Sequence, residues 1–156
     1  LSKNDRLDFI SLDFFDFDSS YVVKAVLTPY SNDSIFDMKT NTDRMHTYNK
    51  YAKIKFNLCE TSIELNVYKD QELTNDQIDN DELFLPFYDN TNGITTYSGG
   101  RYIDLKVGKD SIIYIDFNKA YNPYCLYNYK FSCPIVPSGN YIAFDIKAGV
   151  KDYSKK

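Results

Sequence analysis

The chain has 156 residues, of which 43% are hydrophobic and 17% aromatic, and its formal net charge is −4. That length predicts a single domain over residues 1–156 with one hydrophobic core. The net negative charge excludes a protein that binds nucleic acid through a basic face. No apolar run approaches the roughly 20 residues of a transmembrane segment.

Aromatic residues dominate the composition, with 15 tyrosines, 11 phenylalanines and no tryptophan. Such residues favour strands, so we expect a mostly β protein. Because the chain begins with Leu1 and not with Met, a leader peptide, a lipid anchor or another upstream segment can lie outside these residues.

The N-terminal part predicts one helix and two strands. A serine and an aspartate at capping distance predict a short helix over Lys3–Ile10. Residues 14–18 and 21–29 have the composition of two short strands joined by a turn at the two serines between them. Pro29 ends the second strand because it cannot donate to a ladder.

Residues 30–50 are polar and show no sustained period, which predicts a long loop. The loop contains His46, the only histidine of the chain. A histidine without a second soft ligand nearby is more typical of a surface or hydrogen-bonded residue than of a metal ligand, since a metal needs three or four protein ligands. We expect no metal site and no cofactor.

Residues 51–58 and 62–68 form the clearest hairpin pattern in the chain, joined by Cys59, Glu60 and Thr61. Apolar and polar residues alternate in both halves, which predicts one dry and one wet face. Cys59 is then an isolated thiol in a turn.

The middle of the chain starts with an acidic polar stretch, 69–82, which predicts either a single helical turn or a solvated linker. The following residues, 84–89, predict a short strand, and Pro86 should place that strand at an edge or a bulge. Residues 90–93 carry a turn signal.

Residues 101–107 and 111–117 predict a second hairpin with a loop of three residues. Both faces of this hairpin are chemically consistent in one register. The predicted pairs are Val107–Ser111, Leu105–Ile113, Ile103–Ile115, Arg101–Phe117, Tyr102–Asp116 and Asp104–Tyr114.

The last predicted strand is 141–147, with Ile142, Phe144 and Ile146 facing the core. About eight short strands and one short N-terminal helix predict an all-β, mainly antiparallel fold, either a β-sandwich or a small barrel.

Residues 84–105 and 115–149 resemble the hallmark segments of the family catalogued as domain of unknown function 1684, and 12–27 resembles its opening segment. The motif DFN-x-AYNP-x-C at 116–125, with a following CP, is the most specific part. The resemblance is to the short form of the family in Bacteroidetes-like bacteria, which implies an exported or lipid-anchored envelope protein. It implies no activity.

The positions that match the family pattern are Asp89, Thr91, Gly93, Thr96, Tyr97, Gly99, Gly100, Arg101, Asp116, Asn118, Tyr121, Asn122, Cys125 and Cys133. Ser98 departs from it, because a third glycine is common there.

Cys125 and Cys133 allow three interpretations. A disulfide would stabilise the fold by roughly 2 to 3 kcal/mol on a chain-entropy estimate and suits an exported protein. A structural metal would need Cys59 and His46 as further ligands. Two packed free thiols are the third interpretation. Cysteine catalysis is disfavoured because no base lies close in sequence.

Gly99, Gly100 and Arg101 allow two interpretations. Backbone N–H groups and the guanidinium could converge on an anion such as a carboxylate. The alternative is a turn or bulge entering the strand, with Arg101 paired to a buried acid.

Carboxylate and amide side chains of Asp89, Asp104, Asp116, Asn118 and Asn122 have the chemistry of a hard-cation site or of the paired acids of a glycosidase. Hydrogen bonding within their own turns explains the two asparagines equally well. The tyrosines of 121–129 could stack on sugar rings or pack under a long loop.

We therefore expect a non-catalytic small-ligand-binding or interaction module of the cell envelope, whose partner is an unidentified small molecule or protein. Its surface would form where the loop at 89–101 meets the loop at 118–134, with Arg101 as anion clamp and tyrosines 97, 121 and 127 as walls. The candidate ligand-binding residues are Asp89, Thr91, Tyr97, Arg101, Asp116, Asn118, Tyr121 and Asn122. The first alternative is a hydrolase with Asp89 or Asp116 as general base, and the second is a purely structural domain.

Overall fold

The computed structural model describes residues 11–72 and 81–153, and most of these residues lie in antiparallel strands. The strands are β1 (Val22–Lys39), β2 (Met45–Leu58), β3 (Thr61–Asp70), β4 (Glu82–Asp89), β5 (Arg101–Lys106), β6 (Ile112–Asp116) and β7 (Tyr141–Ile142). Three single 3₁₀ turns accompany them: η1 (Ser19–Tyr21), η2 (Phe117–Lys119) and η3 (Tyr124–Leu126).

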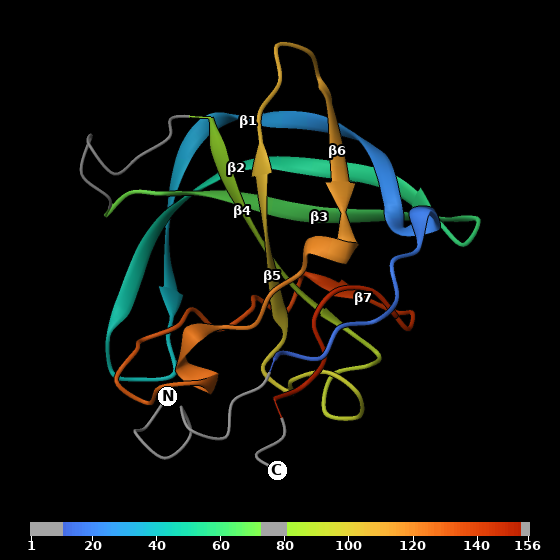
Figure 1. The fold of residues 1–156 in the computed structure, drawn as a ribbon. Coiled ribbons are helices and arrows are strands. Elements are labelled where there is room, and N and C mark those ends of the chain that lie inside the picture. Colours follow the sequence, from blue (N-terminus) through green and yellow to red (C-terminus); the bar gives the residue numbers. More distant parts are fainter. Residues whose placement is uncertain (1–10, 73–80, 154–156) are drawn as a thin grey trace.

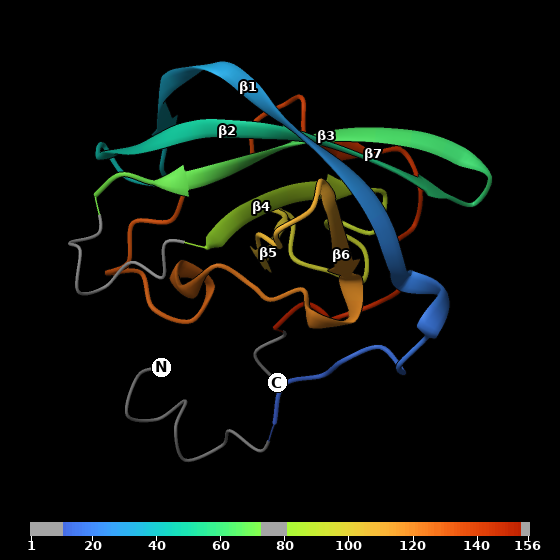
Figure 2. The ribbon, with the colours of Figure 1, turned by 90° about the horizontal axis from the view of Figure 1, so that it is seen from above.

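The strands form one curved sheet in the order β5-β4-β3-β2-β1-β6, and β7 pairs in parallel with β4 (Figure 1). Seen from above, β1, β2 and β3 lie on one side, and β4, β5 and β6 lie on the other (Figure 2). The sheet is therefore a nearly closed barrel, which confirms the predicted all-β fold. The predicted helix Lys3–Ile10 lies outside the described residues.

The barrel interior is filled by the inward-facing side chains of the strands. Examples that are at most 2% exposed are Ala25, Ile54, Leu65, Leu85, Ile103 and Ile115. Burial of a branched aliphatic side chain contributes about 1.5 to 3 kcal/mol, so this core is the main source of stability. No helix within 11–72 and 81–153 has the length and apolar character to cross a membrane.

The prediction of a long loop over 30–50 was wrong, because β1 and β2 extend through most of it. After a register shift between Pro29 and Ser34, the two strands pair again as far as Lys39 with Met45. Pro29 thus interrupts the ladder without ending the strand. Backbone pairing with a long partner outweighs the polar composition that suggested a loop.

A second apolar cluster explains why this extension is ordered. It lies outside the barrel core and consists of Met38, Tyr48 and Tyr68, with Phe36 and Phe84 packed against it. These apolar residues are widely spaced along polar stretches, so the sequence shows no strand period there. Only the pairing of the strands brings them together.

The hairpin of β2 and β3 confirms the sequence prediction. Leu58 pairs with Thr61, so the turn consists of Cys59 and Glu60 and is one residue shorter than predicted. Their φ angles are 50° and 61°, the left-handed values of a two-residue type I′ turn.

The predicted hairpin register of 101–107 with 111–117 was wrong. In the sheet Ile103 pairs with Leu85 of β4, whereas Ile115 pairs with Val23 of β1. Among the described residues no ladder joins β5 to β6, and the barrel stays open between them. The buried faces of both strands were predicted correctly, but alternation does not specify the partner strand.

Pro86 leaves a gap between β3 and β4, which are paired only at Tyr68 and Phe84 in the described sheet. The buried side chain of Asn140 fills this gap. Its Nδ2 donates to the carbonyls of Asn66 and Pro86, both at 2.8 Å, and its Oδ1 accepts from the N–H of Asn66 at 3.0 Å. The side-chain amide of Asn140 thus replaces the backbone hydrogen bonds that Pro86 cannot make. On the side that faces β3, the strand therefore behaves as an edge at Pro86, as predicted.

The two end segments are less regular than predicted. The expected strand 14–18 makes one bridge, between Phe14 and Val150, flanked by a hydrogen bond from the N–H of Phe15 to the carbonyl of Gly149 at 2.9 Å. The expected strand 141–147 is reduced to β7, although Ile142 and Ile146 are buried and Phe144 packs against the core, as predicted.

Candidate functional site

The two irregular segments expected to form the site lie side by side. Tyr102 and Tyr121 exchange two backbone hydrogen bonds of 2.9 Å, which ties the start of β5 to the segment after η2. Gly100 packs so closely that an added Cβ would lie 2.7 Å from Cγ2 of Val136. Tyr102 directly follows the 89–101 loop, and Val136 closely follows the 118–134 segment, so the two segments meet at one boundary.

Arg101 lies beneath this boundary and is completely buried, as is its partner Asp89. Its guanidinium donates to Oδ2 of Asp89 at 2.7 Å, to the carbonyl of Ile146 at 3.0 Å and to that of Val150 at 3.2 Å, and it also binds the carbonyl of Ala148. The structure therefore corrects the predicted anion clamp, because Arg101 has no donor at the surface. The alternative interpretation, an arginine paired with a buried acid, agrees with the position of Arg101.

Burial lowers the pKa of Arg101, because a desolvated guanidinium loses hydration. The charge of Asp89 and the hydrogen bond to it oppose this effect. The guanidinium also lies 5.2 Å from the ring centre of Phe87, while its Nε has no hydrogen-bond partner. The guanidinium is thus surrounded by groups of the protein itself.

The second carboxylate oxygen of Asp89 shapes the 89–97 loop. It accepts hydrogen bonds from the N–H of Thr91 at 2.8 Å and from the Thr91 hydroxyl, which in turn lies 2.8 Å from Oγ1 of Thr96. Nδ2 of Asn92 closes the loop by donating to Oγ1 of Thr96 at 3.0 Å and to the carbonyl of Tyr97 at 3.0 Å. Asp89 and Thr91 are therefore buried elements of the scaffold.

Asp116 and Asn118 form a separate network. Asp116 caps η2, and its Oδ1 accepts from the backbone N–H and from Nδ2 of Asn118, both at 2.9 Å. Nδ2 of Asn118 also donates to the carbonyl of Asp18 at 2.9 Å. Asn118 thus bonds its own turn and holds the N-terminal segment, and Asp116 is engaged in the cap.

The tyrosines and Asn122 line the boundary itself. The hydroxyl of Tyr121 donates to Oδ1 of Asp104 at 2.8 Å, and Nδ2 of Asn122 donates to the hydroxyl of Tyr127 at 3.0 Å. Tyr97 is half-buried, and burial raises its pKa, with the neighbouring cysteines contributing in the same direction. Of the three tyrosines predicted as walls, Tyr121 and Tyr127 are already hydrogen-bonded within the protein.

Asp104 is a polar group that Tyr121 brings into this region. Desolvation of its carboxylate raises the pKa of Asp104, and hydrogen bonds from Tyr121 and Glu82 oppose the shift. Burial raises the pKa of Tyr121, and the charge of Asp104 and the hydrogen bond to it act in the same direction. This pair therefore fixes the Tyr121 ring rather than presenting a free acid.

Cys125 and Cys133 are both free thiols in the structure. They are in contact, since the backbone N–H of Cys125 lies 3.1 Å from Sγ of Cys133. Burial, followed by the hydrogen bond to Cys133, raises the pKa of Cys125 to about 12. A thiol with so little thiolate is a poor nucleophile at neutral pH.

His46 lies at the start of β2, next to two acidic side chains. Its Nε2 is 2.9 Å from Oδ1 of Asp70 and its Nδ1 is 3.1 Å from Oε2 of Glu72, which also pairs with Arg44 at 2.8 Å. The ring stacks on Tyr48 with 4.5 Å between ring centres. The part of the chain that the structure describes contains no group of three His, Cys, Asp or Glu side chains arranged to hold a metal ion.

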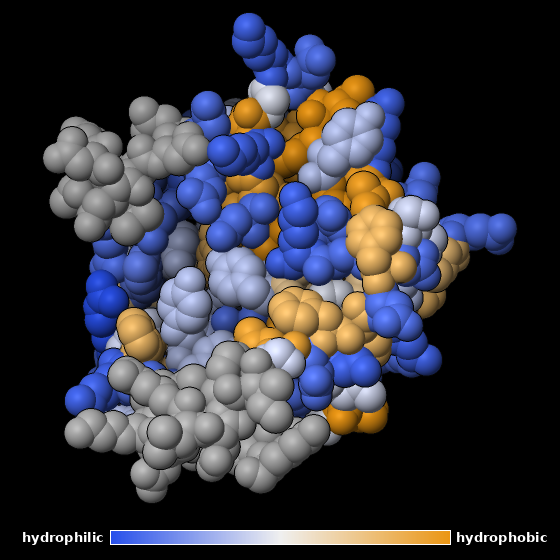
Figure 3. Space-filling model, in the orientation of Figure 1, coloured by the Kyte–Doolittle hydropathy of each residue, from blue (hydrophilic) through white to orange (hydrophobic). Residues whose placement is uncertain are grey.

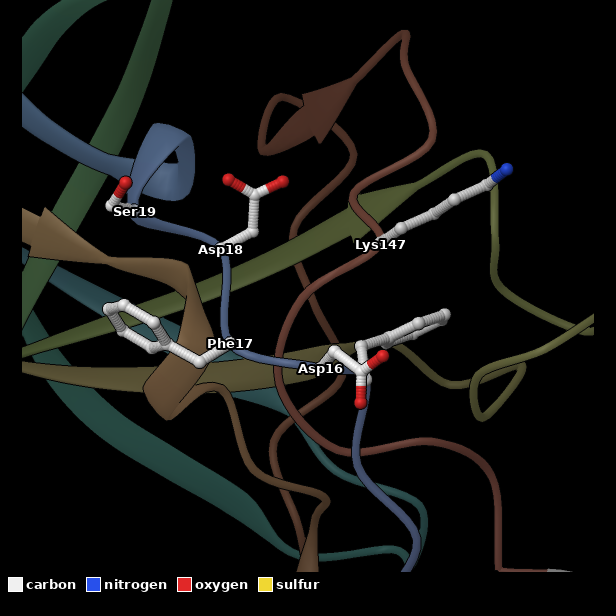
Figure 4. Close-up of a pocket in the computed structure, with 6 residues that line it drawn as sticks. Asp16, Phe17, Asp18, Ser19 and Lys147 are labelled. Carbon is white, nitrogen blue, oxygen red and sulfur yellow. The ribbon is translucent and has the colours of Figure 1, made fainter.

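An open hollow of about 490 Å³ lies where the N-terminal segment passes Lys147 (Figure 4). In Figure 4 the carboxylates of Asp16 and Asp18 and the amine of Lys147 point in different directions. The lining residues are Phe15, Asp16, Phe17, Asp18, Ser19 and Lys147. Because its charged groups do not converge, the hollow is not a preformed site for one ligand.

Several exposed apolar side chains near the boundary belong to the segment that starts at η3, and Ile94 of the 89–101 loop is exposed as well (81%). We call this set the aromatic ledge: Tyr124 (63% exposed), Tyr129 (84%), Phe131 (49%) and Ile135 (44%). The rings of Tyr124 and Phe131 are 5.8 Å apart. Figure 3 shows pale and orange side chains among blue ones at the lower left of the molecule.

Sequence reasoning missed two kinds of residue. The ledge residues Phe131 and Ile135 fit a packed loop as well as a surface, and only the structure shows that they are exposed. Asn140 carries no motif, and its role follows from the distant Pro86.

Comparisons with known proteins agree with this fold. The solution NMR structure of the uncharacterized protein from gene locus rrnAC0354 of Haloarcula marismortui is similar with a TM-score of 0.77 and 33% identity, over 97% of this chain and 81% of that chain. No curated protein matches. The family model described as "Protein of unknown function (DUF1684)" matches residues 7–151, and the chain therefore belongs to the DUF1684 family.

Proposed function

We propose that the protein is a non-catalytic small-ligand-binding or interaction module that uses the aromatic ledge as its contact surface. The observation that carries the proposal is the exposure of four large apolar side chains within one segment, Tyr124 to Ile135. Contiguous exposed apolar surface is costly in water and is typical of binding sites.

The C-terminal end of the ledge is held against the rest of the protein. The N–H of Cys133 donates to Oδ1 of Asn41 at 2.7 Å, and the N–H of Ile135 donates to the carbonyl of Lys39 at 2.7 Å. The hydroxyls of Thr42 and Ser132 lie 2.7 Å apart. Residues 132–135 therefore lie along the end of β1, and the three rings lie on the loop that precedes them.

The ligand class that suits this surface is a saccharide. Tyrosine offers a flat apolar face and a polar hydroxyl, which match the two kinds of surface on a sugar ring. Lys130 is exposed between the ring positions and supplies a hydrogen-bonding group.

Catalysis is less well supported, because the groups that a hydrolase would need have other partners. Asp89 is buried in its pair with Arg101, and Asp116 caps η2. A general base must reach the substrate, and the two carboxylates belong to separate hydrogen-bond networks.

We also propose a bacterial origin and an exported or lipid-anchored envelope location, as the family resemblance implies. An envelope location agrees with a saccharide ligand, since glycans are abundant there. Fractionation of cells that carry the full-length gene tests the location. Recovery in the cytosol alone would contradict it.

Replacing Tyr129 by alanine should weaken saccharide binding about tenfold, or about 1.4 kcal/mol, because it removes the most exposed ring of the ledge. Isothermal titration with chitohexaose and with cellohexaose measures the affinity. The matched control is Tyr114→Ala, which removes a tyrosine that is 65% exposed on β6 and should leave the affinity unchanged. No heat of binding by the wild-type chain with either sugar, or equal losses in the two variants, would contradict the proposal.

A further inference from the structure

The contact between Cys125 and Cys133 closes the loop on which the aromatic ledge lies. The backbone N–H of Cys125 lies 3.1 Å from Sγ of Cys133, and the neighbouring Cys133 raises the pKa of Cys125 in addition to burial. Cys133 is 7% exposed and Cys125 is partly exposed, so solvent reaches the pair from the Cys125 side.

The loop between the cysteines is held partly by hydrogen bonds of its own. The N–H of Asn128 donates to the carbonyl of Tyr124 at 3.0 Å, and the N–H of Phe131 donates to that of Asn128 at 3.1 Å. Two side chains of the loop also bond outside it, Tyr127 with Asn122 and Ser132 with Thr42. At the end of the loop the N–H of Cys133 donates to Oδ1 of Asn41, just after β1, whereas within the described residues Cys125 makes no backbone hydrogen bond to a strand. A covalent link between the cysteines would attach the Cys125 side of the loop to this fixed end.

We propose that Cys125 and Cys133 are a redox pair whose disulfide locks the aromatic ledge and raises its affinity for the ligand. The inference rests on the proposed function only for the affinity; the lock itself concerns the loop alone. A disulfide limits the open states of the loop, and preorganisation strengthens binding by reducing the ordering cost.

The oxidation is a thiol–disulfide exchange with a low-molecular-mass disulfide such as oxidised glutathione. The thiolate of Cys125, after losing its proton to solvent, attacks one sulfur of the oxidant, forms a mixed disulfide and releases one glutathione thiolate. The thiolate of Cys133 then attacks Sγ of Cys125 and releases the second glutathione. Two protein thiols become one disulfide, and the oxidant disulfide is reduced to two thiols.

The environment of the pair makes this exchange slow. The pKa of Cys125 is raised to about 12, chiefly by burial, so little thiolate is present at neutral pH. The pair should stay reduced in a compartment with abundant thiols and become oxidised in an oxidising one. The redox state of Cys125 and Cys133 would then indicate the compartment in which the protein is located.

The test uses the full chain with Cys59→Ser, since Cys59 is exposed and would form intermolecular disulfides. The protein is equilibrated with reduced or oxidised glutathione, and its intact mass is measured. Hydrogen exchange then measures the amides of 124–132. We expect oxidation to remove two hydrogens from the mass and to slow exchange in this loop at least tenfold. The further variant Cys125→Ser is the control and should show neither change.

Two outcomes would overturn the inference. In the first, no disulfide forms at any glutathione ratio while Cys125 and Cys133 are both alkylated after unfolding. In the second, the disulfide forms but exchange in 124–132 does not slow. If the loop locks and chitohexaose binds the oxidised form no more tightly than the reduced form, the coupling to binding is wrong. If neither form binds any saccharide, the proposed function fails while the lock stands.

Discussion

Replacing Arg101 by methionine should lower the free energy of unfolding by about 3 to 5 kcal/mol. The substitution leaves the carboxylate of Asp89 buried without a counter-ion, and it removes the donors to the carbonyls of Ile146, Ala148 and Val150. Chemical denaturation followed by tyrosine fluorescence measures the loss, because the chain contains no tryptophan.

The matched control is Arg44→Met, which breaks an ion pair whose arginine side chain is 55% exposed. Exposed pairs contribute about 1 kcal/mol or less, so this variant should be close to wild type. The double variant Arg101→Met with Asp89→Asn should recover part of the loss, because it removes the unpaired charge. Equal stabilities for Arg101→Met and Arg44→Met would mean that the buried pair is not needed by the fold.

Replacing Gly100 by alanine should destabilise the protein by about 2 to 4 kcal/mol. Gly100 has a φ of +88°, and a Cβ there would lie 2.8 Å from the carbonyl oxygen of Phe87 and 2.7 Å from Cγ2 of Val136. Backbone strain and overlap therefore act together at the boundary between the two loops. Thermal unfolding by circular dichroism measures the effect.

Gly139→Ala is the control for this prediction, because a Cβ there has no heavy atom within 4 Å and Gly139 does not have a positive φ. It should change the stability by less than about 0.5 kcal/mol, or increase it slightly through a smaller unfolded-state entropy. A small loss at Gly100, similar to that at Gly139, would show that the 89–101 loop can shift away from Val136.

Arg101 and Asn140 have the same structural role. The guanidinium binds three alternate carbonyls of segment 146–150, and the carbonyl of Gly149 between them accepts from the N–H of Phe15. Asn140 likewise joins β3 to β4 beside Pro86. Each side chain supplies hydrogen bonds where a neighbouring strand is missing, so neither is free to bind a ligand.

Local prediction succeeded where two strands are joined by a turn of only two residues. The β2–β3 hairpin follows from strict alternation and a short turn, and the left-handed Cys59 and Glu60 fit between its strands. The same reasoning failed for β5 and β6, which have an equally regular alternation but pair with β4 and β1. Alternation identifies the buried face, whereas barrel closure selects the partner.

Prediction of the site was limited in a similar way. Asp89, Arg101, Cys125 and Cys133 were selected through the family resemblance, and the structure brings Asp89 to Arg101 and Cys125 to Cys133. The sequence left open whether Arg101 is a surface clamp or the partner of a buried acid, because the letters Asp and Arg are the same in both cases. Apart from Asp89, the partners of Arg101 lie more than forty residues away and have no side-chain signature, since they are carbonyls.

The sequence by itself determined the β class, the buried face of most strands and the tight turn between β2 and β3, because these depend on residues close together in the chain. Only the tertiary structure decided which strands are neighbours, which acid and which carbonyls Arg101 binds, and that the aromatic ledge faces solvent. Those properties depend on contacts between distant segments, and their free energies arise only when the barrel closes.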